Sequence, residues 1–116
     1  MQSIDFSSDN VERLITLTDI LGDTLIKAGF GVYIDQLSQI RLAAERHDKE
    51  SFEKQVINRD MFGGAGALWE IWIDDKQLQN KFERQFCEFV DQLKKMGIND
   101  KRVNQIRKGF IRGDKI

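Results

Sequence analysis

Apolar side chains recur at steps of three and four residues along most of the chain, which is the spacing of one helix face. This pattern predicts a first helix that begins near Ser7, Ser8 or Asp9 and ends before Gly29 and Gly31. The apolar positions that define this helix are Val11, Leu14, Ile15, Leu21 and Leu25. Gly22 interrupts the pattern at a cost of about 1 kcal/mol relative to alanine, so we expect it to let a neighbouring helix cross closely.

The same spacing predicts four more helices. A second covers about 32–47, and a short third follows Ser51, which is the expected N-cap. The fourth, about 76–96, has the most regular apolar stripe and a C-cap at Gly97. A fifth covers about 99–112. The stripe of the fourth helix consists of Leu78, Phe82, Phe86, Phe89, Val90 and Leu93.

A glycine-rich stretch separates the third and fourth predicted helices. Gly63, Gly64 and Gly66 are followed closely by both tryptophans, Trp69 and Trp72. Glycine allows a tight corner, and we interpret the stretch as such a corner followed by a buried segment, in which two indoles would fill much of a small core. The alternative is that the indoles border a contact surface. We favour a helical turn over a strand for 68–73, because the sequence offers no second strand to pair with it.

Together these elements predict an all-α chain, with about five short helices in an irregular antiparallel bundle around the glycine corner and the tryptophan segment. The length of 116 residues fits one domain, 1–116. The single cysteine, Cys87, excludes an internal disulfide, and no apolar run approaches the roughly 20 residues that cross a bilayer. We therefore expect a cytoplasmic protein without a membrane partner.

Charge is unevenly distributed along the chain. Residues 1–50 carry a net charge of −4, residues 51–93 carry −3 and residues 94–116 carry +6. An acidic body with a basic tail is informative about partners rather than about fold. The basic helix 99–112 could contact phosphates, but the acidic body would repel nucleic acid, so we regard nucleic acid as the less favoured partner.

The sequence offers little that would support catalysis. The glycine cluster lacks the Lys-Ser/Thr pair of a phosphate-binding loop, His47 lies in a charged connector, and Cys87 has no histidine close to it in sequence. Glu70, between the tryptophans, is better explained by a solvent contact or a helix N-terminus than by acid catalysis. We predict no enzyme activity, no catalytic residue, no cofactor and no metal site.

The glycine corner resembles a known motif. Phe62, Gly63, Gly64 and Gly66 match the signature of a family of small, uncharacterised bacterial proteins, which reads Phe-Gly-Gly-Met-Gly-Ser, then an apolar residue, Asn and Asp. Ala65, Ala67, Trp69 and Glu70 depart from its Met, Ser, Asn and Asp. The similarity covers roughly residues 11–97 and implies no activity. In size, helical class and charge the chain also resembles the immunity proteins of bacterial toxin–immunity pairs.

The hypothesis that follows is a bacterial immunity protein that binds a cognate toxin domain, such as a nuclease, and occludes its active site. Acidic side chains suit a basic toxin, because complementary charge speeds association and sets specificity. The predicted partner-binding residues are Glu70, Trp72, Asp74 and Asp75 around the tryptophans, and Asp19, Asp23 and Asp35 on the first helices. The alternative is a nucleic-acid-binding or regulatory module that uses the basic helix 99–112.

Overall fold

The computed structural model describes residues 4–57 and 71–98. These residues form four α-helices and a single turn of 3₁₀-helix, so the predicted helical class is confirmed for this part of the chain. The glycine corner and the predicted fifth helix, 99–112, lie outside the described residues. The elements are α1 (Ser8–Lys27), η1 (Gly31–Tyr33), α2 (Ile34–Glu45), α3 (Lys49–Val56) and α5 (Lys76–Met96).

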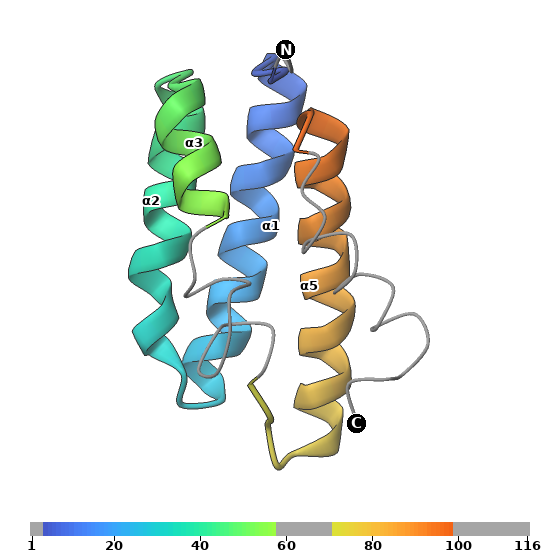
Figure 1. Cartoon of the computed structure of the whole chain (residues 1–116). Coiled ribbons are helices and arrows are strands. Elements are labelled where there is room, and N and C mark those ends of the chain that lie inside the picture. The colour runs from blue at the N-terminus through green and yellow to red at the C-terminus, as the bar shows by residue number, and fades with distance from the viewer. Residues whose placement is uncertain (1–3, 58–70, 99–116) are drawn as a thin grey trace.

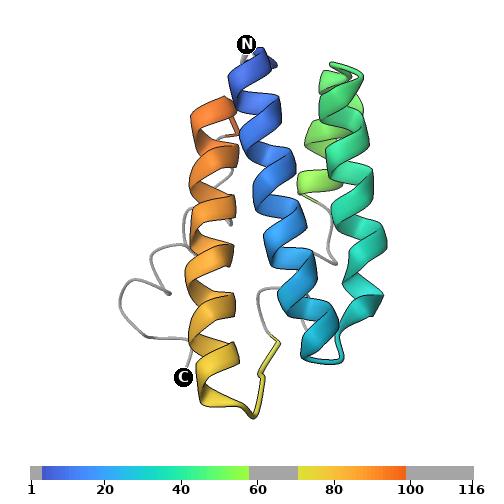
Figure 2. The ribbon, with the colours of Figure 1, turned by 180° about the vertical axis from the view of Figure 1, so that it is seen from behind.

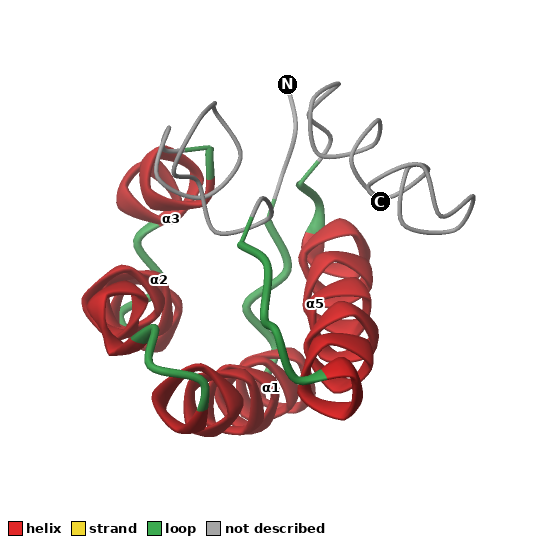
Figure 3. Ribbon diagram, turned by 90° about the horizontal axis from the view of Figure 1, so that it is seen from below, coloured by secondary structure: helices red, strands yellow, loops and turns green. Residues whose placement is uncertain are grey.

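Successive described helices alternate in direction, and α1 lies in the middle (Figure 1). α2 packs along one flank of α1 and α5 along the other, while α3 packs on α2. The reverse view has the same order (Figure 2). Seen along the helices, α3, α2, α1 and α5 follow an arc, and the segment that leads into α5 passes along its inner side (Figure 3). One end of the molecule therefore gathers the end of α1 and the beginnings of α2 and α5.

The core is a single apolar cluster to which every described α-helix contributes. Phe82, Phe86 and Phe89 of α5 are each 0% exposed, and their spacing of four and three residues places them on one face of the helix. The ring centroids of Phe82 and Phe86 are 5.7 Å apart, and those of Phe86 and Phe89 are 6.3 Å apart. The regular stripe predicted for this helix is thus buried as expected.

The helices α1, α2 and α5 all end in the same hydrogen-bonded motif, which needs a residue of positive φ just after the helix. Gly29, His47 and Gly97 occupy that position, with φ of 84°, 55° and 123°. After α1, the N–H of Gly29 donates to the carbonyl of Ile26, and the next N–H reaches back to Leu25. Gly29 and Gly97 confirm the predicted C-cap glycines, whereas Gly31, also expected to help end the first helix, begins η1 and has no positive φ. The histidine side chain stacks on Phe6, with centroids 5.4 Å apart.

Gly29 offers a direct test of this explanation. Replacing Gly29 with alanine should lower the free energy of unfolding by about 1 kcal/mol, because an L-residue is strained at positive φ. Nothing lies within 4 Å of the added Cβ, so the backbone is the only source of strain. Urea denaturation measures the effect. Gly31→Ala is the matched control, since it has equally open space without a positive φ, and an equal loss in both variants would contradict the account.

The cap of the third helix differs from the prediction. Asp48, not Ser51, is the N-cap of α3, and its carboxylate accepts hydrogen bonds from the Ser51 backbone N–H at 3.1 Å and from the Ser51 hydroxyl at 2.9 Å. Aspartate and serine are both good caps. The choice depends on where α2 ends, because the chain turns into α3 directly after Asp48. The helix therefore begins at Lys49, three residues earlier than it would with Ser51 as the N-cap.

These hydrogen bonds from Ser51 lower the pKa of Asp48, and the positive charge of Arg46 adds to the effect. A lowered pKa stabilises the fold above the pKa of the unfolded chain, about 4, and this contribution is lost as pH falls through the folded-state value. Asp48→Asn keeps an acceptor for the helix N–H but does not ionise. The wild type should therefore melt at a higher temperature than Asp48→Asn at pH 7, and the difference should shrink as the pH falls below about 4 and Asp48 becomes protonated in the folded state as well. A difference that does not depend on pH would contradict the assignment.

The segment before α5 also differs from the prediction. Ile71–Ile73 is not helical, although we favoured a helical turn for 68–73; the remainder of that stretch lies outside the described residues. Burial alternates along it, with Ile71 and Ile73 buried and Trp72 exposed, as in extended chain. The prediction of a buried segment is therefore wrong for Trp72, while Trp69 lies outside the described residues. The Ile73 N–H donates to the side-chain oxygen of Gln79 at 2.8 Å. A side chain of α5 thus satisfies the Ile73 N–H, which in a helix or a sheet would donate to a backbone carbonyl.

Buried polar contacts fix how α1 lies against α5. The Thr24 hydroxyl, near the end of α1, donates to Gln85 Oε1 in the middle of α5 at 2.7 Å. Gln92 Nε2, near the end of α5, donates to the Asn10 carbonyl near the start of α1 at 3.1 Å. A shift of one helix along the other would leave these buried groups without partners, which is costly.

Among the described helices, none is both long enough and apolar enough to cross a membrane.

Candidate protein-binding surface

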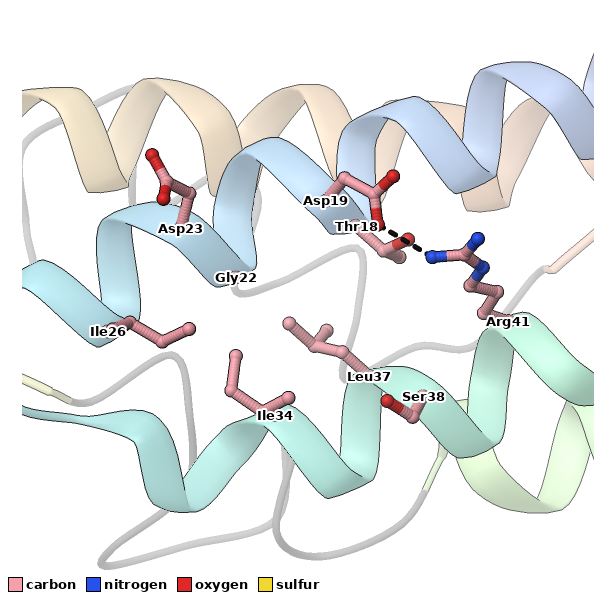
Figure 4. Close-up of a pocket in the computed structure, with 9 residues that line it drawn as sticks. All are labelled: Thr18, Asp19, Gly22, Asp23, Ile26, Ile34, Leu37, Ser38 and Arg41. Carbon is pink, nitrogen blue, oxygen red and sulfur yellow. Dashed lines mark hydrogen bonds and ion pairs between the residues drawn. The ribbon is translucent and has the colours of Figure 1, made fainter.

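A groove of about 230 Å³ runs between α1 and α2, and we refer to it as the α1–α2 groove. Gly22 forms part of its wall because it has no side chain; a Cβ at this position would approach Ile34 Cδ1 to 3.1 Å. The expected close approach of a neighbouring helix at Gly22 is thereby confirmed. Figure 4 shows Ile26, Ile34 and Leu37 around the space beside this glycine.

An ion pair between α1 and α2 spans one end of the α1–α2 groove. Arg41 Nη1 of α2 donates to Asp19 Oδ1 of α1 at 2.6 Å, directly across the groove (Figure 4). The same guanidinium contacts Glu45 through Nε at 3.2 Å. Both partners of the bridge are partly exposed, at 39% for the Arg41 side chain and 60% for that of Asp19, so the pair is screened and contributes little to stability.

The other end of the α1–α2 groove is apolar and more open. Ile26 is 61% exposed there, and Asp23 lies one helical turn before it. The Asp23 carboxylate is 3.2 Å from Lys27 Nζ, a helical i, i+4 pair in which both side chains are more than half exposed. Such pairs are weak, so this carboxylate can exchange its lysine for another cation at little cost.

Three of the most exposed large apolar side chains lie where α1 ends and α2 and α5 begin. Ile26 is 61% exposed, Val32 79% and Trp72 53%, on the end of α1, on η1 and on the segment before α5 (Figure 1). Exposed aspartates belong to the same segments, which carry four carboxylates and two lysines, Lys27 and Lys76. We call this surface the acidic end, and it consists of Asp23, Ile26, Val32, Asp35, Trp72, Asp74 and Asp75.

Most of the predicted partner-binding residues can be placed. Asp19 and Asp23 line the α1–α2 groove together, while Asp35 is exposed in the first turn of α2. Asp74 and Asp75 are exposed beside Trp72, and Asp75 is also the N-cap of α5, accepting from the Leu78 N–H at 3.1 Å. Asp19 thus belongs to the groove alone, Asp35, Asp74 and Asp75 belong to the acidic end alone, and Asp23 belongs to both. Glu70 lies outside the described residues.

The sequence did not predict that Ile26, Ile34 and Arg41 line one groove. Arg41 is 22 residues from its partner Asp19, so no local pattern joins them. Ile26 does have a local signal: it follows Leu25, which belongs to the apolar stripe, and an isoleucine directly beside that stripe points away from the core.

His47 and Cys87, the two candidate catalytic residues, lie on different elements. His47 is exposed between α2 and α3 and stacks on Phe6, while Cys87 is half-buried on α5. Within residues 4–57 and 71–98, no group of three or more His, Cys, Asp or Glu side chains is arranged to hold a metal ion.

Comparison of the chain with protein-family models, with curated proteins and with solved structures found no match.

Proposed function

We propose that this chain is a cytoplasmic bacterial immunity protein that binds a cognate toxin domain and occludes its active site. The observation that carries the proposal is the acidic end, where segments that meet at one end of the molecule expose Ile26, Val32 and Trp72 together with four aspartates (Figure 1). A tryptophan and aliphatic side chains supply desolvation energy at an interface. Carboxylates around them favour a basic partner and speed its approach.

A nuclease domain is the kind of toxin that this surface suits best. A nuclease presents cationic side chains to the phosphates of its substrate, and an acidic protein surface can bind those same side chains. Residues 4–57 support this view, because they carry ten Asp and Glu against six Lys and Arg. An interface of standard size, about 1,600 Å² in total, would extend from the acidic end over part of the α1–α2 groove.

The test uses the full chain and the toxin domain encoded by the adjacent gene. Expression of that toxin domain alone should stop bacterial growth, and co-expression of this chain should restore it. The two purified proteins should elute as one complex from a sizing column at micromolar concentration. Duplex DNA is the control ligand, since binding through basic residues would fall steeply between about 50 and 200 mM salt. Separate elution of the two proteins together with no rescue of growth would refute the proposal.

A further inference from the structure

The α1–α2 groove could bind an apolar side chain and a neighbouring cationic side chain of a partner. Its open end is apolar, formed by Ile26, Ile34 and Leu37, and its rim carries the carboxylate of Asp23. The bridge from Asp19 to Arg41 spans the other end. An apolar side chain could therefore enter beside Gly22, and a cation on the same partner segment would meet Asp23.

We propose that the α1–α2 groove receives an amphipathic helix of the toxin domain, which inserts one apolar side chain beside Gly22 and places a lysine or arginine one turn away against Asp23. This inference rests on the proposed function and specifies its contact. Helix-in-groove recognition uses anchors at spacings of three, four and seven residues. The groove is long enough for such anchors, because Thr18, Gly22 and Ile26 lie at four-residue steps along one face of α1 and so span about two helical turns.

Charge favours a basic occupant over an acidic or neutral one. Asp19 and Asp23 outnumber Arg41 among the groove residues, and the current partner of Asp23 is a lysine of its own helix at 3.2 Å. A partner cation can replace Lys27 without leaving a buried charge, since both side chains are more than half exposed. An acidic segment would instead place like charges together, which is strongly unfavourable at an interface.

The glycine at the centre of the groove fits the same role. Glycine inside a helix costs about 1 kcal/mol relative to alanine, and Ile34 Cδ1 is the flexible end of a side chain that can move aside. Gly22→Ala should therefore fold at least as well as the wild type. It would, however, fill the space that the partner side chain needs. A more stable variant with weaker binding would mark Gly22 as a residue that shapes the groove.

Isothermal titration of the full chain with the toxin domain encoded by the adjacent gene tests the inference. Asp23→Lys should raise Kd at least tenfold and Gly22→Ala several-fold, with circular dichroism confirming that both fold. Glu88→Lys makes the same charge change on α5, on the opposite flank of α1, and should alter Kd less than threefold. Wild-type binding with an unchanged Kd for Asp23→Lys and Gly22→Ala would overturn this inference alone. Absence of wild-type binding would overturn the proposed function as well.

Discussion

Replacing Phe86 with alanine should lower the free energy of unfolding by about 3–5 kcal/mol, as is typical for a large aromatic side chain in a core. Phe86 is 0% exposed, and it lies between the rings of Phe82 and Phe89 on the face of α5 that enters the core. Its loss removes apolar burial and leaves a cavity that helices fixed on both flanks of α1 cannot close. Domains of this size have about 5–15 kcal/mol of stability in total, so the variant should be close to unfolding.

Urea denaturation followed by far-ultraviolet circular dichroism measures this effect. Phe86→Leu is the control, because it retains most of the buried apolar volume, and it should cost about 1–2 kcal/mol. The ratio between the two variants separates cavity formation from any general intolerance of substitution in α5. A loss of less than about 1 kcal/mol in Phe86→Ala would show that α5 does not pack as described.

Replacing Trp72 with alanine should affect binding far more than folding. Tryptophan is among the residues that dominate protein interfaces, where truncation costs at least about 2 kcal/mol, equivalent to a rise in Kd of about 30-fold. The side chain is 53% exposed while Ile71 and Ile73 on either side of it are buried, so the chain holds the indole at the surface. Its own contribution to the core is therefore limited, and the unfolding transition should move much less than in Phe86→Ala.

Titration of Trp72→Ala with the toxin domain measures the change in Kd. Leu42→Ala is a suitable control, since Leu42 is also an exposed apolar residue, at 39%, but lies towards the end of α2 that is remote from the acidic end. It should change Kd by less than threefold. If both variants bind as tightly as the wild type, Trp72 is not part of the contact.

The helices themselves were predictable because local rules agree with the tertiary structure. In α5 the apolar stripe, the cap at Asp75 and the glycine at position 97 all indicate the same limits, and the structure places the helix at Lys76–Met96. The cap of α3 was less predictable, because Asp48 and Ser51 are both suitable and their choice depends on where α2 ends. The positive φ of His47 was not predictable either, because α2 ends there without the glycine that usually marks such a turn.

The candidate surface was predictable only in part. An acidic first half was visible in the sequence, and Asp19 and Asp23 could be named from charge alone. The exposure of Trp72 was not predictable, because the sequence left open whether the tryptophans are buried or lie at the surface. The α1–α2 groove was not visible, because it depends on which faces of two helices meet. Its bridge joins Asp19 to Arg41 across a helix pair, and its depth depends on a missing side chain at Gly22. Such features need coordinates.

Nuclear magnetic resonance offers the most direct test of the claim that this protein acts by binding a protein partner through the acidic end. Isotopically labelled chain would be titrated with unlabelled toxin domain, and backbone amide shifts would be followed. The account predicts the largest shifts at 19–38 and 71–76. Shifts confined to α3, to the second half of α5 or to the basic segment 99–112 would contradict it.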